Sequence, residues 1–396
     1  MSAFRRFARK SAPDLFLKAG LFLAAGVAAA GAEPLKIGFV VTLSGPGAVI
    51  GNDMVAGFKL GMKDAGLENT PVVYGDDQFK PDVGRQVSTK LLESDHANLI
   101  TGMIWSNVLL ASAKPILDAN AILISANAGP SELAGKQCHP NFFNTAFEND
   151  TLHEPGGQYA QSKGIKKLAL IAPNYPAGKD ALNGVKRFYK GAVAAELYPA
   201  LDQFDFAADI ATLRASGAEA TYFFFAGAQA INFVKQYAQA GMTKTMPLIG
   251  SIPSLDAIVR GGTGPAAIGA EVLTYWDDSI DNPTNKKFVS EFIADQNRKP
   301  TGYAATAYDT ATLIAAALKK VNGDVADRKA FSRALASVEF PSVRGAFKFN
   351  TNHMPIQNFY AGPIVADGDG KSKIGPLELV LKDYKDSFAA TCQMAD

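Results

Sequence analysis

The sequence predicts an α/β protein built from two open, mostly parallel sheets whose faces are covered by helices. Short apolar runs rich in Val, Ile, Leu and Phe alternate with stretches of helical periodicity, which is the βαβ pattern of a parallel sheet. This alternation stops around Asn141–Pro155 and then starts again, so the chain contains two such halves. With 396 residues, 47% of them hydrophobic and 19% charged, the chain is long enough for two domains of ordinary size.

The opening stretch Leu35–Gly66 shows the pattern most clearly. Leu35–Leu43 is a β-branched and apolar run of the kind that forms a strand buried on both faces. A glycine-rich turn follows at Ser44–Gly51, and helical spacing of apolar residues starts at Asn52. Because ligands of open α/β sheets bind beyond the carboxyl ends of the strands, this turn is expected to be the first wall of a binding site.

The rest of the first half is expected to supply three more strands and the helices between them. The expected strands are Pro71–Gly75, Ala97–Gly102 and Ala121–Ser125, and the expected helices are Asp82–Ser94, Val108–Lys114 and Ser131–Ala134. Asp82 is expected to cap its helix, and Pro115 is expected to end the next one.

The second half repeats the plan. Its expected strands are Leu168–Ala172, Val193–Tyr198, Ala220–Phe225 and Met246–Gly250, and its expected helices are Lys179–Tyr189, Ala207–Ser216 and Gln229–Ala240. The end of the chain is expected to return to the two lobes rather than to start a third domain. It contributes a strand at Glu271–Trp276, helices at Pro283–Asn297 and Ala304–Val321, and ribbon strands at Gly345–Asn350 and Asn358–Ala366.

The first 32 residues have the composition of a leader. The basic residues near the start are Arg5, Arg6, Arg9, Lys10 and Lys18. The short apolar core Leu21–Ala30 precedes Ala30-Gly31-Ala32, which fits a cleavage site, so we expect export with cleavage near Ala32. The alternative is a buried N-terminal helix. Removing residues 1–32 leaves 34 basic and 37 acidic residues, a net charge of −3, with no basic run that favours nucleic acid or a lipid surface.

The chain has two cysteines, Cys138 and Cys392, and both lie beyond the leader. An oxidising compartment favours a disulfide between them. The alternative, two unrelated thiols, stays open at this point, because sequence does not show proximity.

The sequence gives little support for an enzyme or a cofactor-binding protein. The turn Gly45–Gly51 is close to a G-x-G-x-x-G motif, and Asp76-Asp77 ends the next strand, as in a dinucleotide site. However, Pro46 removes an N–H group where a pyrophosphate needs donors. The histidines are scattered and no G-x-S-x-G is present, so we expect no metal centre, no cofactor and no catalytic activity.

Polar and aromatic residues gather at the expected carboxyl ends of the strands. They are Ser44, Ser106, Asn107, Ser125, Asn127, Asn174, Tyr175, Gln229, Ser251, Tyr275 and Trp276. Each alone is more often a helix cap or a turn residue than a ligand contact. Together they line the crevice between two facing α/β lobes, where a small-molecule site is expected.

The chain resembles the leucine/isoleucine/valine-binding family of periplasmic solute receptors for ABC importers. The resemblance is carried, in order, by LKIGFVVTLSGPGAVIGNDMVAGF, GDDQFKPDVGRQVSTKLLESD, PILDANAILISANAGPSELAG and GYAATAYDTATLIAAAL. It covers the chain from about Leu35 to the C-terminus and implies a two-lobed type I fold with three hinge crossovers that closes over its ligand. It also implies a monomer that docks on a membrane permease. The expected lobes are residues 34–149 with about 277–350, and residues 150–276 with about 351–396.

The resemblance also assigns residues to the ligand carboxylate. In that family a serine after the third strand and groups after the fourth strand hold the carboxylate. Ser106 matches the serine, and Asn127 and Gly129, with Ala128 between them, occupy the positions after the fourth strand.

Three positions differ from the family pattern. Ile50 and Ala177 stand where the family has tyrosines, and Ile252 stands where it has the acidic residue that binds the ligand ammonium. A buried ammonium without an anion is heavily penalised. The resemblance therefore predicts a ligand that has a carboxylate and no ammonium.

Aromatic residues near the expected crevice favour an aromatic acid as the ligand. They are Trp105, Phe225, Trp276 and Tyr303, and the alternative for each ring is packing in the core. A second interpretation is an amino-acid receptor in which Asp76 or Asp77 binds the ammonium. A third is a sensor that reports its ligand to a membrane kinase without transport.

Overall fold

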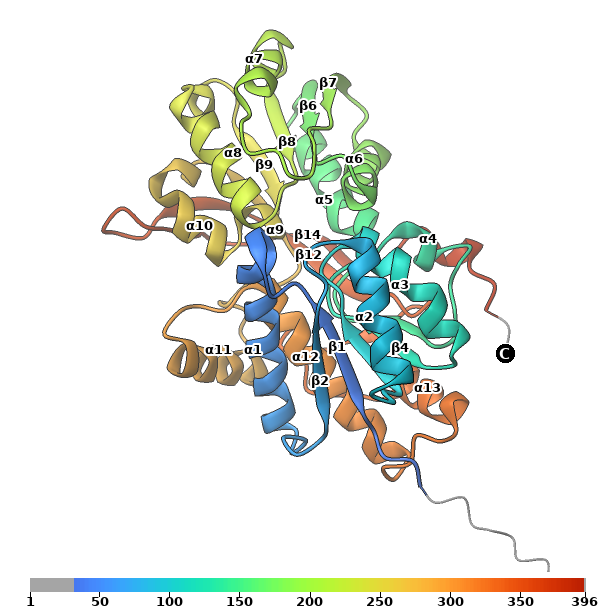
Figure 1. Ribbon diagram of the computed structural model, residues 1–396. Helices are drawn as coiled ribbons and strands as arrows, with labels where there is room; N and C mark the ends of the chain where they lie inside the picture. The colour runs from blue at the N-terminus through green and yellow to red at the C-terminus, as the bar shows by residue number, and fades with distance from the viewer. Residues whose placement is uncertain (1–31, 395–396) are drawn as a thin grey trace, which may run out of the picture. The chain divides into compact units, whose positions relative to one another are not determined.

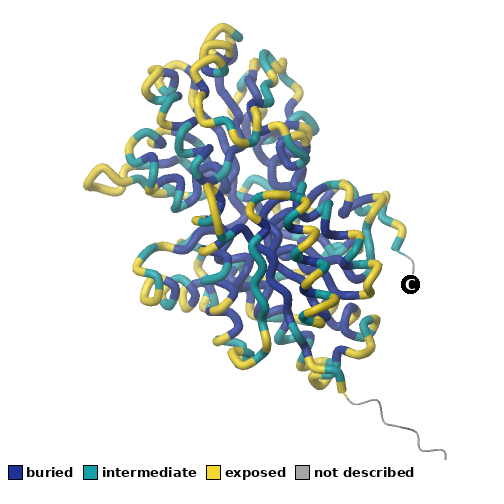
Figure 2. Tube along the Cα trace, viewed as in Figure 1, coloured by how far each residue is buried: buried dark blue, intermediate teal, exposed yellow. Residues whose placement is uncertain are grey.

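The computed structural model describes residues 32–394, and the expected leader lies outside these residues apart from Ala32. The described chain contains two sheets, each flanked by helices (Figure 1). Among the described residues, no helix has both the length and the apolar character needed to cross a membrane. The central strands are buried, whereas outer strands such as Ala192–Leu197 and Glu378–Tyr384 are partly exposed, like the outer helix faces and loops (Figure 2). This confirms the predicted α/β class with mostly parallel sheets.

The first lobe is the sheet of five parallel strands in the order β2-β1-β3-β4-β5, with its helices. The strands are β1 (Ile37–Val41), β2 (Val72–Asp76), β3 (Leu99–Gly102), β4 (Ile122–Ser125) and β5 (Phe142–Asn144). The helices that follow them are α1 (Ala48–Asp64), α2 (Pro81–Glu93), α3 (Ser106–Asp118) and α4 (Ser131–Ala134). A short 3-10 turn, Gly45–Gly47, precedes α1.

Successive residues of β1 face opposite sides of the sheet and contact a different helix on each side. The ring of Phe39 packs on Phe58 of α1 with centroids 4.8 Å apart. On the opposite face a Cβ on Gly38 would lie 3.0 Å from the Leu91 side chain of α2. Helix α1 in turn packs closely on α12 (Gly302–Lys320), because a Cβ on Gly57 would lie only 2.1 Å from the carbonyl oxygen of Ala304.

The second lobe contains the other sheet, in the order β11-β12-β10-β9-β8-β6-β7, with β13 and β14 also paired to β12. Its parallel strands are β6 (Lys167–Ile171), β7 (Ala192–Leu197), β8 (Ala220–Phe223), β9 (Leu248–Ser251) and β10 (Glu271–Thr274). Its antiparallel strands are β11 (Lys348–Phe349), β12 (Pro355–Ala366), β13 (Ser372–Ile374) and β14 (Glu378–Tyr384).

The remaining helices connect or cover these strands. They are α5 (Asn149–Ser162), α6 (Pro176–Phe188), α7 (Ala207–Ala215), α8 (Gly227–Gln239), α9 (Ile252–Leu255), α10 (Ala257–Thr263), α11 (Pro283–Gln296) and α13 (Arg328–Ser337), with 3-10 turns at Met242–Lys244, Gly264–Ala267 and Ala389–Thr391.

The chain passes from the first sheet to the second after β5, leaves the second sheet after β10 for α11, α12 and α13, and returns to it at β11 and β12. The segment between β11 and β12 runs beside the end of β5, because the amide of Asn144 donates to the carbonyl of His353 at 3.1 Å. The tail then returns to the first lobe, where Cys392 forms a disulfide with Cys138. The predicted disulfide is confirmed, and the last residues of the expected second lobe lie against the first.

Three local predictions were wrong. Lys80, and not Asp82, precedes the first residue of α2, so Asp82 lies within the first turn and does not cap it. Helix α3 continues through Pro115 to Asp118, because its buried face includes Ile116. The break expected around Asn141–Pro155 contains β5 and the start of α5.

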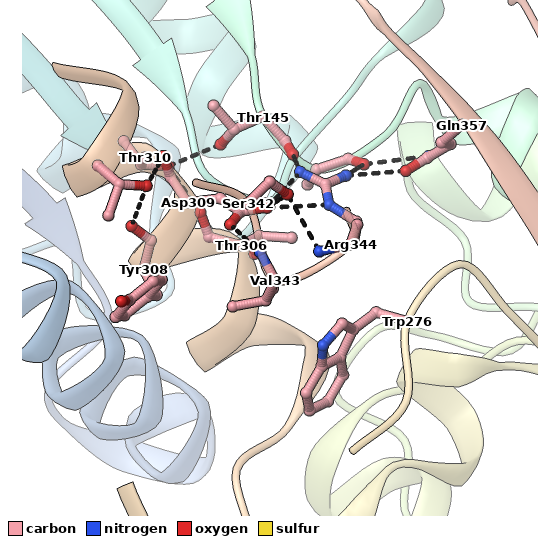
Figure 3. Close-up of polar contacts among 12 residues, drawn as sticks. Thr145, Trp276, Thr306, Tyr308, Asp309, Thr310, Ser342, Val343, Arg344 and Gln357 are labelled. Carbon is pink, nitrogen blue, oxygen red and sulfur yellow. Dashed lines mark hydrogen bonds and ion pairs between the residues drawn. The ribbon is translucent and has the colours of Figure 1, made fainter. Parts of the chain in front are cut away.

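The buried side chain of Arg344 contacts three segments that are far apart in the sequence (Figure 3). Its guanidinium forms an ion pair with Asp309 of α12 at 2.9 Å and donates to Gln357 of β12 at 2.8 Å. It also donates to the carbonyls of Thr145 and Ala146, which follow β5. We call these five residues the Arg344 cluster. The cluster thus connects helix α12, strand β12 and the segment that follows β5.

Candidate functional site

The candidate site lies between the lobes, at the carboxyl ends of their parallel strands. The lobes contact each other there: Ile50 of α1 lies 3.3 Å from the position that a Cβ on Gly227 of α8 would take. Gly227 has a φ of 53°, which a glycine adopts without strain. The close approach of these two helix starts encloses the cleft.

The outer part of the cleft is a cavity of about 440 Å³ whose walls are rich in aromatic rings. Both lobes contribute rings, which are Phe79, Trp105, Tyr175, Phe204 and Phe224. Such rings offer a large apolar contact area and stack well on a planar ligand. This part of the cleft therefore suits a flat, apolar ligand body.

Trp105 is held in place by its neighbours. Its indole Nε1 donates to the hydroxyl of Thr42 at 2.8 Å, and its ring lies 4.2 Å from that of Phe79. The Thr42 hydroxyl in turn donates to Asp77, whose pKa is raised by burial. Asp76 accepts the amides of Leu43 and Gln78. Both acids proposed from the sequence as ammonium partners thus bind groups of the turns around Trp105, although Oδ2 of Asp77 is buried and has no partner among the described residues.

The inner part of the cleft is a smaller cavity of about 180 Å³. Its lining residues come from both lobes and from the start of α12: Asn127, Ile252, Pro253, Asp256, Tyr275 and Tyr303, with Gly302 beside them. Ile252 and Asp256 also line an adjoining cavity that contains Arg260, Trp276 and Asp277. The inner cavity is thus mainly apolar but contains one buried carboxyl and one buried amide.

Asp256 is the acid that lines the inner cavity, and its pKa is shifted by burial. It is 2% exposed, and burial raises its pKa to about 7 against the opposing effects of the Val259 amide and Arg260. Its Oδ1 caps α10 by accepting the Val259 amide at 2.8 Å, whereas Oδ2 has no partner among the described residues.

Ser106 lies in a buried network at the start of α3. Its hydroxyl oxygen accepts from the side-chain amide of Asn149 at 3.1 Å, which leaves the hydroxyl proton free to donate. Asn149 also accepts the amide of Gly129 at 3.2 Å and donates to Asp180 at 2.9 Å. Ser131 donates to the same carboxylate at 3.2 Å, so the network joins the first lobe to α6 of the second. Burial raises the pKa of Asp180 to about 6.

The structure brings together some of the residues proposed from the sequence. The outer cavity contains Ile50, Trp105, Tyr175 and Gln229, and the inner cavities contain Asn127, Ile252 and Trp276. Six others line none of these cavities, and two of them, Ser106 and Gly129, belong to the Asn149 network. Ser44 is exposed, the Ala128 carbonyl accepts from Ser125 and Asn144, and Ala177 and Phe225 are buried in the hydrophobic cores of the second lobe.

Sequence reasoning missed Phe79, Phe204, Phe224 and Asp256 as cleft residues. Asp256 carried a signal, since an aspartate before Ala-Ile-Val-Arg is typical of a helix N-cap, and α10 begins directly after it. Phe79 carried none, because it lies in a turn and has a φ of 63°. In the described part of the chain, no three His, Cys, Asp or Glu side chains are grouped so that they could bind a metal ion.

Residues 34–369 match the model of a family described as periplasmic binding proteins. The chain belongs to this family. A relative called Leu/Ile/Val-binding protein homolog 6, from Brucella melitensis, is 25% identical over 360 residues, which are 86% of this chain and 90% of the relative.

Solved structures agree with this assignment. A solute-binding protein of an ABC transporter from R. palustris, in complex with benzoate, superposes with a TM-score of 0.84 at 30% identity, over 90% of this chain and 99% of that one. A branched-chain amino acid transporter substrate-binding protein from Streptococcus pneumoniae, in complex with isoleucine, gives a TM-score of 0.78 at 21% identity, over 88% and 99%. The type I fold expected from the sequence is thereby confirmed for this periplasmic binding protein.

Proposed function

We propose that this periplasmic binding protein is the extracytoplasmic receptor of an ABC importer and binds an aromatic carboxylate between its lobes. The observation that carries the proposal is the outer cavity, which is lined by rings of both lobes, among them Trp105 and Tyr175. The benzoate complex of the R. palustris protein supports it. The proposed role is binding and delivery, without catalysis.

The carboxylate is proposed to bind at the start of α3. Ser106 is the first residue of this helix of 13 residues, where backbone N–H groups point out of the helix. The Ser106 hydroxyl retains a proton to donate, since its oxygen accepts from Asn149. Aromatic rings around the anion exclude water, which strengthens hydrogen bonds to a charged group.

Delivery is proposed to follow from closure. Contacts across the cleft, such as the Ser131–Asp180 hydrogen bond, form only when the lobes meet. A ligand that contacts both lobes stabilises the closed state, and a permease distinguishes closed from open receptors by their surfaces. The protein is proposed to act as a monomer in the periplasm after its leader is removed near Ala32.

An amino acid is the second candidate ligand, because one observation favours it. Asp256 lies in the inner cavity four residues after Ile252, so a carboxyl is present near the position where the family's acidic residue is missing. The name of the Brucella relative points in the same direction.

A thermal-shift screen of aromatic acids and amino acids distinguishes the two candidates. A ligand that binds only the folded protein raises its melting temperature by mass action. We expect benzoates and cinnamates to raise it and leucine, isoleucine and phenylalanine to leave it unchanged. A rise with the amino acids alone would replace the aromatic-acid proposal by the amino-acid one.

A further inference from the structure

The inner cavity contains two buried oxygen atoms that have no hydrogen-bond donor among residues 32–394. Oδ1 of Asn127 and Oδ2 of Asp256 both lack partners, and the residues are 8% and 2% exposed. Both residues line the same cavity of about 180 Å³, one from the first lobe and one from the second. A buried acceptor without a donor costs about 1–3 kcal/mol, so a ligand that supplies donors gains affinity there.

The remaining atoms of these two side chains are engaged, which fixes where the free acceptors lie. The amide nitrogen of Asn127 donates to the carbonyl of Ile104 at 2.7 Å. Oδ1 of Asp256 accepts the Val259 amide at the start of α10. Neither side chain can turn its free oxygen toward another partner without losing an existing hydrogen bond.

The surroundings of Asp256 favour a neutral donor over a cation. Its negative charge is already opposed by the buried guanidinium of Arg260, which also faces Asp277 and Asp278, and by the start of α10. With its raised pKa, the carboxyl is partly neutral near pH 7. The other walls are the rings of Tyr275 and Tyr303 and the side chains of Ile252 and Pro253, and none of them supplies a second anion for an ammonium.

We propose that Asn127 and Asp256 form a subsite for a hydroxyl group at the end of the ligand opposite its carboxylate. This inference rests on the proposed function and makes it narrower: the preferred ligands are hydroxylated aromatic acids rather than unsubstituted ones. A phenolic hydroxyl donates one hydrogen bond, which the free oxygen of Asp256 accepts beside that of Asn127, while its ring contacts Tyr303 and Ile252.

The test compares isomers by calorimetric titration. With the wild-type protein we expect 4-hydroxybenzoate to bind about tenfold more tightly than benzoate, because a hydrogen bond to a buried, partly charged acceptor contributes about 1–2 kcal/mol. We expect 2-hydroxybenzoate, whose hydroxyl is next to the carboxylate, to show no such gain. These comparisons need no variant, so they do not depend on the folding of a mutant.

The variant Asp256→Asn keeps the size of the side chain and its capping role but places an amide nitrogen where the free oxygen was. We expect it to lose most of the preference for 4-hydroxybenzoate and to keep the affinity for benzoate within about threefold. The matched control is Asp327→Asn, the same change at the exposed N-cap of α13, which should keep the full preference.

Equal affinity of the wild-type protein for benzoate and 4-hydroxybenzoate would overturn the subsite and leave the proposed function intact. A preference that survives in Asp256→Asn would also overturn it. If phenylalanine binds and both benzoates do not, the proposed function itself fails, and loss of that binding in Asp256→Asn would assign the carboxyl to an amine.

Discussion

The Arg344 cluster and the inner cavity are both buried and polar, but their hydrogen bonding differs. In the cluster, Arg344 has acceptors on three segments, and Asp309 accepts from Ser342, Val343 and Arg344 (Figure 3). In the inner cavity, Asn127 and Asp256 each retain an acceptor without a donor. Polar atoms whose hydrogen bonds are all made within the protein stabilise a fixed geometry, whereas an acceptor without a donor is available to a ligand. Burial alone therefore does not identify a binding residue in this protein.

The largest effect that this comparison predicts is on stability, in the variant Arg344→Met. It leaves the fully buried carboxyl of Asp309 without its cation, and breaking such a buried pair costs about 3–5 kcal/mol. Urea unfolding monitored by circular dichroism measures the loss.

The control is Lys286→Met, which removes an exposed ion pair with Asp281 and should cost less than about 1 kcal/mol. Similar losses in both variants would show that the Arg344 cluster is not a special structural element.

The next prediction concerns ligand affinity and uses Ser106→Ala. Removal of a hydroxyl that donates to a carboxylate should weaken binding by about 1.5–3 kcal/mol, roughly ten- to a hundredfold. The free energy of unfolding of the empty protein should fall by about 1 kcal/mol at most, because Asn149 keeps its hydrogen bond to Asp180. Titration calorimetry and urea unfolding report the two effects separately. An unchanged dissociation constant would make Ser106 a structural residue only.

The smallest predicted effect is a pH dependence at the contact between the lobes. Because burial raises the pKa of Asp180 to about 6 from its ordinary value, the folded protein binds a proton there that the unfolded chain has released. Stability at this group therefore falls as the pH rises from about 4 to 6 and is constant above that range. In Asp180→Asn this contribution is absent, so the slope of the free energy of unfolding against pH between about pH 4 and 6 should be more positive than in the wild-type protein by about 1 kcal/mol per pH unit. Equal slopes would mean that Asp180 titrates normally.

Much of the architecture could be predicted because each parallel strand is an apolar run, as at Ile37–Val41, and each is followed by a helical period. Helix α5 was missed because Gly156 and Gly157 disfavour a helix by propensity. In the fold these glycines permit close packing: a Cβ on Gly156 would lie 2.2 Å from the ring of Tyr222, and one on Gly157 would lie 2.1 Å from the carbonyl of Val185. Tertiary packing therefore stabilises helix α5 although the local helix propensity is low.

The site could be predicted in part for a similar reason. Residues directly after strands, such as Trp105 and Asn127, were found because strand ends define the cleft. Phe225 was proposed on the same rule, but the strand ends at Phe223 and the Phe225 ring packs on Phe206 in the core. Asp256 was missed because its place in the cleft depends on the short helix α9, which turns the chain back into the inner cavity.

The central claim, that the cleft binds a carboxylate whose body has no ammonium, is tested most directly by a pair of ligands that differ in that group alone. Tyrosine and 3-(4-hydroxyphenyl)propanoate have the same ring, hydroxyl and carboxylate, and leucine and 4-methylpentanoate form a second pair with an aliphatic body. Calorimetric titration of both pairs should show the tightest binding for 3-(4-hydroxyphenyl)propanoate, at least a hundredfold above tyrosine, because an ammonium beside Ile252 costs several kcal/mol. Tighter binding of tyrosine or leucine than of its deaminated partner would contradict the account.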